Sequence, residues 1–492
     1  MPDAQDLTIW KNRWLALDQA LGVLFERIQK TPTLSRKLTL ENLVKRLRLF
    51  AEGQFNFFYD GFGSKNKHDL ASSDEFPVEY VFGVTLDQIG YDLEVLQRIV
   101  DQRSSGDQTV LNAADRLAWQ ALQPALPFLE MSQEAEDSER VTVVTYFQKS
   151  ASIRVIPYAP VALIAIPFTC TWVYRDYLAI PHEVGHYVYR HGFYKELEDQ
   201  DPPQLPRSED QDPSDLFRIK VKTEQETPDY VKRWKEEIFA DVYGCLIGGP
   251  VIALDFMDLM LQHSEEEFTQ EGKEAQHPIP ILRPHIYTHI LEKDQVTGKN
   301  KLDQYWQDQV NKRYLPARNV PGTYRVGRDN LLLKHDDIKE ELNGKVDREN
   351  QLLEHDDIKE ELNGIAYQIF RLLSARRSNS VWSRGLAANE DVADLYKKFE
   401  DFVKQKAMGP NPDLPLLPQL PPPKEISWWN EESLWRKWVT KKRFFGGYAP
   451  IPVGQGQIRA GTKAVLDKFP NGDWIHVLAA DGWATKGPHS RR

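Results

Sequence analysis

Three residues between Ile180 and Gly192 could bind a metal ion and use it for chemistry. His182 and His186 are four positions apart, so on a helix both imidazoles project from one face and can bind the same ion. Glu183 would lie about 100° further round that helix. This places its carboxylate beside the metal, where it can accept a proton from a water molecule. The spacing therefore predicts a hydrolytic metal site on a helix.

A metal site of this kind needs a third protein ligand, and three places in the chain could supply it. On a continuous helix His191 points roughly 180° away from the first histidine. Cys170 lies in the apolar segment IPFTCTWV, which favours a buried and unreactive thiol. The third place is the helix predicted over residues 227–247, where Glu237 and Asp241 are four positions apart and share a face.

A His-Glu-x-x-His motif on one helix, followed by Glu-x-x-x-Asp on a later helix, resembles the gluzincin zinc metallopeptidases. This group includes the thermolysin-like enzymes and the membrane prenyl-protein peptidases. The resemblance implies that His182, His186 and Glu237 bind one Zn²⁺ ion and leave a fourth position for water. It further implies that Glu183 acts as general base on the zinc-activated water, and that Asp241 accepts a hydrogen bond from a liganding histidine.

The same resemblance suggests how charge on the substrate carbonyl oxygen would be stabilised. Prenyl-protein peptidases carry a His-Pro pair and then an Arg after the third ligand, which in the stretch HPIPILR points to His277 and Arg283. We take His277 as the second catalytic residue. In this group an edge strand before the metal helix holds the substrate backbone, and the segment VIPYAPVALIAIP has the matching position.

The elements that must position these residues indicate an α+β fold that is predominantly helical. Runs rich in β-branched residues between Arg140 and Phe168 predict a small β-sheet just before the metal helix of a zincin-like core. Near the N-terminus, Trp10, Trp14 and Leu17 recur at helical spacing, which predicts a helical domain.

We expect five regions along the 492 residues, each distinguished by its composition. They are a helical N-terminal domain (1–135), a zinc metallopeptidase core (136–300) with an acidic loop (196–215), a helical region with a tandem 20-residue duplication (301–408), a proline-rich linker (409–425), and a C-terminal region with a small β tail similar to a Src-homology barrel (426–492).

The overall composition excludes several classes of function. The formal net charge is −11, whereas binding to nucleic acid phosphates needs clustered Lys and Arg. The two cysteines form no disulfide framework, and the most apolar window, 155–168, is too short and too interrupted by proline to span a membrane. With no signal peptide pattern at the N-terminus, we expect a cytoplasmic protein with neither nucleic-acid nor membrane partners.

The expected function is that of a soluble zinc-dependent metalloendopeptidase acting on protein or peptide substrates. Two alternatives remain open at this point. One is a zinc hydrolase of a non-peptide or short-peptide substrate. The other is an interaction protein with a structural zinc, in which the N-terminal helical domain or the C-terminal β tail binds partners.

Overall fold

The protein is described by a computed structural model that divides into two compact units. The first unit comprises Met1–Arg218 and Phe402–Arg492, and the second comprises Ile219–Asp401. Each unit is described by itself below. The structure describes residues 4–63, 77–105, 108–126, 141–154, 156, 158–191, 229–264, 268, 277–294, 301–314, 324–326, 331–333, 359, 362–371, 373, 392–408 and 417–423.

Most of the described chain is helical, which confirms the predicted predominantly helical α+β class. The elements of the first unit are α1 (Ala4–Lys30), α2 (Lys37–Phe62), α3 (Val78–Ser105), α4 (Gln108–Leu122), β1 (Thr142–Gln148), β2 (Ser152–Arg154), β3 (Val161–Pro167), α6 (Ile180–His191) and the short helices η1 (Gln123–Ala125), η2 (Phe168–Thr171), η3 (Tyr174–Ala179) and η4 (Val403–Met408). Those of the second unit are α8 (Asp229–Gly248), α9 (Pro250–Met260), α11 (Arg283–Lys293), α12 (Lys301–Tyr314), β4 (Tyr324–Val326) and β5 (Leu331–Leu333), with α14 (Val392–Phe402) at its end.

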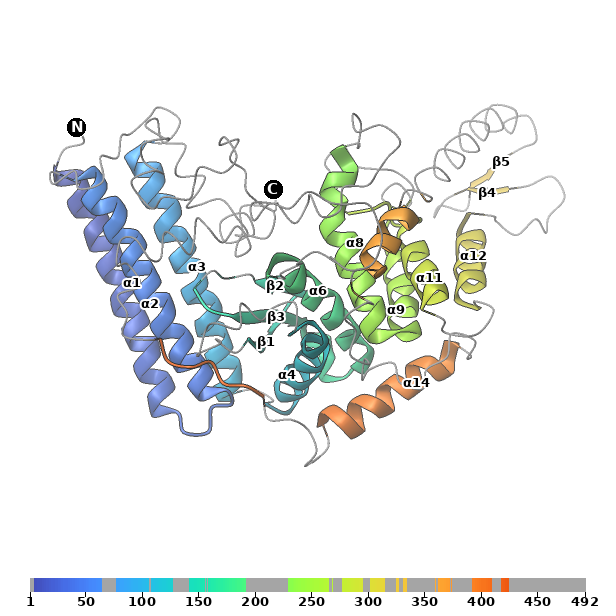
Figure 1. The fold of residues 1–492 in the computed structure, drawn as a ribbon, viewed down its shortest axis with the longest axis horizontal. Coiled ribbons are helices and arrows are strands. Elements are labelled where there is room, and N and C mark those ends of the chain that lie inside the picture. The colour runs from blue at the N-terminus through green and yellow to red at the C-terminus, as the bar shows by residue number, and fades with distance from the viewer. Residues whose placement is uncertain are drawn as a thin grey trace, which may run out of the picture. The chain divides into compact units, whose positions relative to one another are not determined.

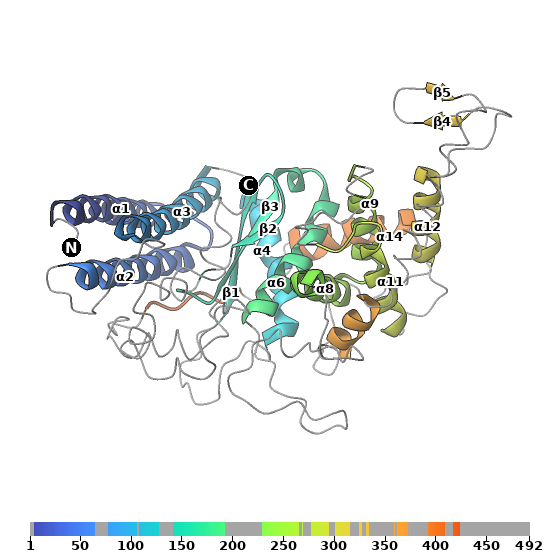
Figure 2. The ribbon, with the colours of Figure 1, turned by 90° about the horizontal axis from the view of Figure 1, so that it is seen from above.

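The first unit has three layers, with a small sheet between two groups of helices. On one side α1, α2 and α3 pack against one another as a bundle, and on the other side α4 packs on β1 while α6 packs on β2 and β3 (Figures 1 and 2). Side chains on one face of the sheet, such as Val144 and Leu163, belong to the same hydrophobic cluster as the bundle helices. Because helices cover both faces, the strands are apolar on both sides rather than alternating.

The strand order β1-β3-β2 corrects one expectation about the substrate-binding strand. The segment that ends in VALIAIP was expected at an edge, but β3 pairs in parallel with β1 and antiparallel with β2, so it lies in the centre of the sheet. Its continuous run of buried β-branched and apolar residues is typical of a central strand. Among the described strands of this sheet, β1 and β2 are therefore the edges.

The helix that carries the histidine motif is amphipathic as its sequence predicts. Val184 and Val188 are fully buried, and α6 packs against α4 as well as the sheet. His182 and His186 lie on a different side of the helix from these valines, and Glu183 stands in its first turn. Packing of the valines thus sets the rotation of the helix and so the direction in which the histidines point.

The second unit is built on α8, α9 and α11, which pack against one another. A tight connection joins α8 to α9, with Gly249 at a φ of 63° and Pro250 at the first helical position. The left-handed backbone at Gly249 suits glycine, and proline is favoured where a helix begins. This connection turns the chain back so that α8 and α9 can both contact α11.

Several sequence predictions fall on residues outside the described part. These are the acidic loop 196–215, the first copy of the duplication (335–344), most of the second copy (355–364), and the whole C-terminal region 426–492. Within the described residues, no helix combines the length and apolar character that crossing a membrane requires.

Candidate metal centre

The candidate metal ligands of the first unit are the pair of histidines on α6. The Nε2 atoms of His182 and His186 lie 3.1 Å apart, and their rings meet edge to face with centroids 4.8 Å apart. His186 is 4% exposed, while His182 and Glu183 are half-buried. The four-residue spacing therefore converges two imidazole nitrogens on one point, as the sequence predicted.

The second unit contains a cluster of its own, centred on a buried ion pair between α8 and α11. The Arg283 Nε donates to Asp241 Oδ2 at 2.6 Å, and Nη2 donates to Asp241 Oδ1 at 2.9 Å. The two side chains are 7% and 0% exposed, respectively. A bidentate guanidinium–carboxylate pair fixes both groups in orientation as well as position. Through Arg283, α11 thereby fixes Asp241, which lies on the same face of α8 as Glu237.

Glu237 is held by the same guanidinium. Arg283 Nη2 also donates to Glu237 Oε2 at 3.0 Å, and that carboxylate is 12% exposed. His277 Nδ1 lies 3.0 Å from the same Oε2, and 59% of the His277 side chain is exposed. The structure thus brings together Glu237, Asp241, His277 and Arg283, the four residues that sequence reasoning selected in this part of the chain.

Arg283 has a different use from the one its position in the sequence suggested. Stabilising an oxyanion would require guanidinium donors directed at substrate, but its Nε and Nη2 donate to the two carboxylates and its Nη1 lies 3.5 Å from His277 Nδ1. The guanidinium group also stacks on Phe256, and its Cζ lies 4.6 Å from the centroid of the phenyl ring. These contacts make Arg283 a positioning residue for Glu237 and Asp241.

The electrostatics of this cluster favour negative charge at Glu237 and Asp241. Burial would lower the pKa of Arg283, but the carboxylates of Asp241 and Glu237 outweigh it and raise that pKa above its ordinary value. The Arg283 guanidinium therefore stabilises the ionised form of both carboxylates.

Tyr287 also belongs to the cluster, although sequence reasoning did not select it. Its hydroxyl donates to Asp241 Oδ1 at 2.9 Å, and burial together with that carboxylate raises its pKa well above the ordinary value. Tyr287 therefore remains a neutral hydrogen-bond donor. Its four-residue spacing from Arg283, which puts both on one face of α11, was the signal that could have identified it.

The structure gives no support for Cys170 or His191 as the third metal ligand. Cys170 is fully buried in η2, and burial, with Asp176, raises the pKa of its thiol, so it stays protonated. This agrees with the interpretation of an unreactive thiol, since the thiolate is the ligand form. His191 is the last residue of α6, and its side chain lies outside the described residues.

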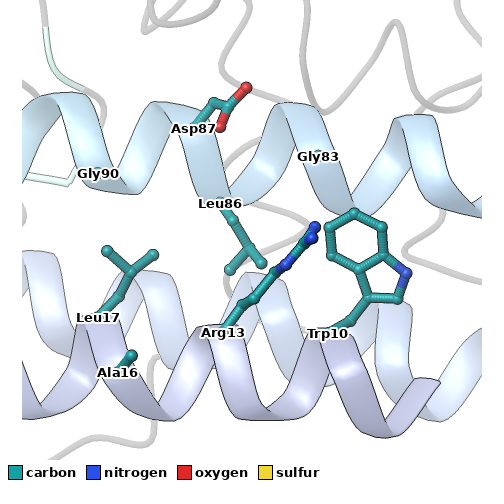
Figure 3. A pocket seen from close by; sticks show the side chains of 8 residues that line it. All are labelled: Trp10, Arg13, Ala16, Leu17, Gly83, Leu86, Asp87 and Gly90. Atoms are coloured by element: carbon teal, nitrogen blue, oxygen red, sulfur yellow. The ribbon is translucent and has the colours of Figure 1, made fainter. Parts of the chain in front are cut away.

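A groove of about 610 Å³ between α1 and α3 offers no comparable chemistry. Figure 3 shows its walls, and the guanidinium of Arg13 lies over the Trp10 ring at 4.4 Å. The lining residues are Trp10, Arg13, Ala16, Leu17, Gly83, Leu86, Asp87 and Gly90. They include a single carboxylate and no histidine or cysteine, so this groove lacks the ligand set of a metal centre.

Comparison with known proteins returned no relative on which a function could be based. No protein-family model, no curated protein and no solved structure matches the chain.

Proposed function

We propose that this protein is a zinc-dependent metallopeptidase in which His182, His186 and Glu237 hold one Zn²⁺ ion. The observation that carries the proposal is that, among the described residues, these three side chains form the group of potential ligands that could hold a metal ion. Two imidazole nitrogens and one carboxylate oxygen are the protein ligands of many catalytic zinc sites, with the fourth position left for water. The donor set therefore fits zinc.

The surroundings of Glu237 support the same proposal. A ligand carboxylate must be ionised and held in place, and the Arg283 guanidinium does both. The same guanidinium binds a second carboxylate, Asp241, and so couples the orientation of Glu237 to the packing of α11 on α8. That Asp241 also accepts a hydrogen bond from a liganding histidine stays a prediction.

The chain's own residues would divide the chemistry as follows. When bound, zinc polarises a carbonyl group and lowers the pKa of water. Glu183, next to the first ligand in the first turn of α6, would take the proton from the attacking water and deliver it to the leaving amine. His277, beside Glu237, would donate to the oxygen on which negative charge develops.

A peptide substrate is favoured by the position of β2. Among the described strands β2 is an edge of the sheet, antiparallel to β3, and α6 packs against it. An extended peptide can add to such an edge through backbone hydrogen bonds, which require little of the substrate sequence. The open edge beside the histidine helix therefore suits a peptide better than a compact small molecule.

A structural zinc is the competing interpretation. Structural zinc sites are closed by a fourth protein ligand. Within the described residues the group has three members, His182, His186 and Glu237, which favours a catalytic site.

The test combines metal analysis with a cleavage assay on casein and on a library of quenched fluorescent peptides. Glu183→Gln should keep one zinc per chain and lose about 10²–10⁴-fold in cleavage rate, because the general base is removed while the ligands remain. His182→Ala should lose the zinc, whereas the matched control His289→Ala should keep it. A Glu183→Gln variant that binds zinc and cleaves at the wild-type rate would show that the proposed mechanism is wrong.

A further inference from the structure

Residues 417–423, with the sequence LPQLPPP, lie along α2 in the first unit. Figure 1 shows them as the orange-red segment that crosses this helix. The segment has no helical or strand structure of its own, and Leu420 is fully buried in the hydrophobic cluster of the α1–α3 bundle. We call residues 417–423 the strap. The burial of Leu420 separates the strap from an ordinary solvated linker, although Gln419 and Pro422 are exposed.

Arg36, which immediately precedes α2, and a row of polar side chains on that helix bind the strap mainly through its carbonyl groups. Arg36 Nη2 donates to Pro418 O at 2.9 Å, and Asn42 Nδ2 donates to Leu420 O at 2.7 Å. One turn further along, Arg46 Nη2 donates to Pro421 O at 3.3 Å. Between Arg36 and Asn42, the Thr39 Oγ1 donates to the Gln419 side chain at 2.7 Å and accepts from the Leu420 amide at 3.3 Å.

The sheet adds one more side chain to this row, and we call the surface formed by Arg36, Thr39, Asn42, Arg46 and Thr142 the groove. Thr142 Oγ1, at the start of the edge strand β1, donates to Pro418 O at 2.7 Å. Arg36 Nη2 in turn donates to Val143 O at 3.1 Å, so one guanidinium joins the strap to the sheet. Arg36 also has a left-handed backbone, with φ 61°. A non-glycine residue seldom adopts this conformation, and it persists only where surrounding contacts hold it.

The groove and the strap are chemically complementary. Four of the seven strap residues are proline, which has no backbone N–H to donate. A proline-rich segment favours the polyproline conformation, in which backbone carbonyls make no internal hydrogen bonds and are free to accept. The groove side chains Arg36, Asn42 and Arg46 can donate there, yet they are at most 8% exposed. Buried donors on a helix face need such acceptors.

We propose that this groove is a recognition site for a proline-rich peptide, and that its occupant is the strap of the same chain. The polar side chains of the groove bind the carbonyl groups of the strap. The hydrophobic cluster that surrounds Leu420 sets the register of the peptide. The strap docks the sequence that follows residue 423 onto the first unit. Because a polyproline segment loses little conformational entropy on binding, the strap is suited to exchange with the same sequence supplied as a separate peptide.

The first test cuts the chain beside the strap in the otherwise intact protein. A specific protease site inserted within residues 409–416 allows the fragment 417–492 to be released after folding. The fragment should stay bound to the nicked wild-type chain on size exclusion, and an excess of the synthetic peptide LPQLPPP should displace it. Asn42→Leu should weaken retention at least about tenfold, because it removes a buried donor. The exposed Asn56 on the same helix offers the matched control, Asn56→Leu, which should retain the fragment.

Separation of the fragment from nicked wild type without competitor would overturn the proposal, and so would equal retention by Asn42→Leu and wild type. A second measurement uses a full chain in which residues 417–423 are replaced by glycine and serine. This chain should bind fluorescent LPQLPPP, the wild type should not, and a peptide with aspartate in place of Leu420 should bind to neither. Failure of the replaced chain to bind the peptide while its circular dichroism remains helical would also overturn the proposal.

Discussion

Two buried arginines, one in each unit, make similar contacts, but the arginine of the second unit also binds a second carboxylate. In the first unit Arg154 on β2 binds Asp92 on α3 at 2.7 Å and stacks on Tyr91. In the second unit Arg283 on α11 binds Asp241 on α8 at 2.6 Å and stacks on Phe256. Both ion pairs join two elements of the core of their own unit.

The difference is a second carboxylate. Arg283 also binds Glu237 at 3.0 Å. Arg154 pairs with Asp92, and Arg103, fully buried in the first unit, pairs with Asp115. Under the proposed function Glu237 is a zinc ligand, so Arg283 would hold a ligand carboxylate in its orientation. The contrast is between ion pairs that join elements of the fold and one that would also position a metal ligand.

Arg283→Met should have the largest effect on stability. It leaves Asp241 and Glu237 without their counter-charge, which should lower the free energy of unfolding of the second unit by about 3–5 kcal/mol. Arg154→Met, the matched change, should cost a similar amount in the first unit through Asp92. Urea unfolding, with hydrogen exchange of α8 and α11 read by mass spectrometry, measures both.

Zinc affinity distinguishes these two arginine variants. Arg283→Met should weaken zinc binding because Glu237 loses its orientation, and Arg154→Met should leave the affinity of the folded protein unchanged. If Arg154→Met reduced zinc affinity as much as Arg283→Met does, the distinction between the two sites would be wrong.

Zinc itself should have the next largest effect. At a free concentration 100 times its Kd, zinc should stabilise the wild-type protein by about 2.7 kcal/mol, and a chelator should remove that gain. Differential scanning calorimetry with and without zinc measures it. A variant lacking His186 should show no gain, so an equal zinc-dependent shift in His186→Ala would contradict the assignment of this ligand.

Tyr287→Phe should change the stability by about as much as zinc does, or by less. The change removes one hydrogen bond to the charged carboxylate of Asp241, which should cost roughly 1.5–3 kcal/mol in unfolding free energy. Tyr305→Phe is the matched control, since its hydroxyl donates to Asp258 in a part-buried position and its loss should cost less. Equal costs for the two variants would argue against a special role for the buried Asp241 cluster.

Local sequence patterns were enough to predict the helices that carry the candidate ligands. The spacing of four between Glu237 and Asp241 predicted a shared helix face, and in the structure one guanidinium binds both. Likewise, the β-branched runs before the histidine helix predicted the strands β1 to β3. These features depend on neighbours within one or two turns, which periodicity reports directly.

Features that depend on packing between distant segments were not predictable in this way. β3 was expected at an edge because its sequence does not state how many strands flank it, and β1 pairs on its other side. The contact of Arg283 with Glu237 depends on how α11 packs on α8. The sequence predicts a proline-rich linker at 409–425 but not the docking of residues 417–423, because their carbonyl groups accept from donors on α2 that lie more than 370 residues away.

The most direct test of the central claim is zinc binding by Glu237→Gln, compared with Glu236→Gln. The two glutamates are adjacent on α8 and both half-buried, so the pair controls for charge and for helix position. Isothermal titration of chelator-treated protein should give one zinc per chain for wild type and for Glu236→Gln, with an affinity at least about tenfold weaker for Glu237→Gln. Wild-type affinity in Glu237→Gln would contradict the proposed metal centre.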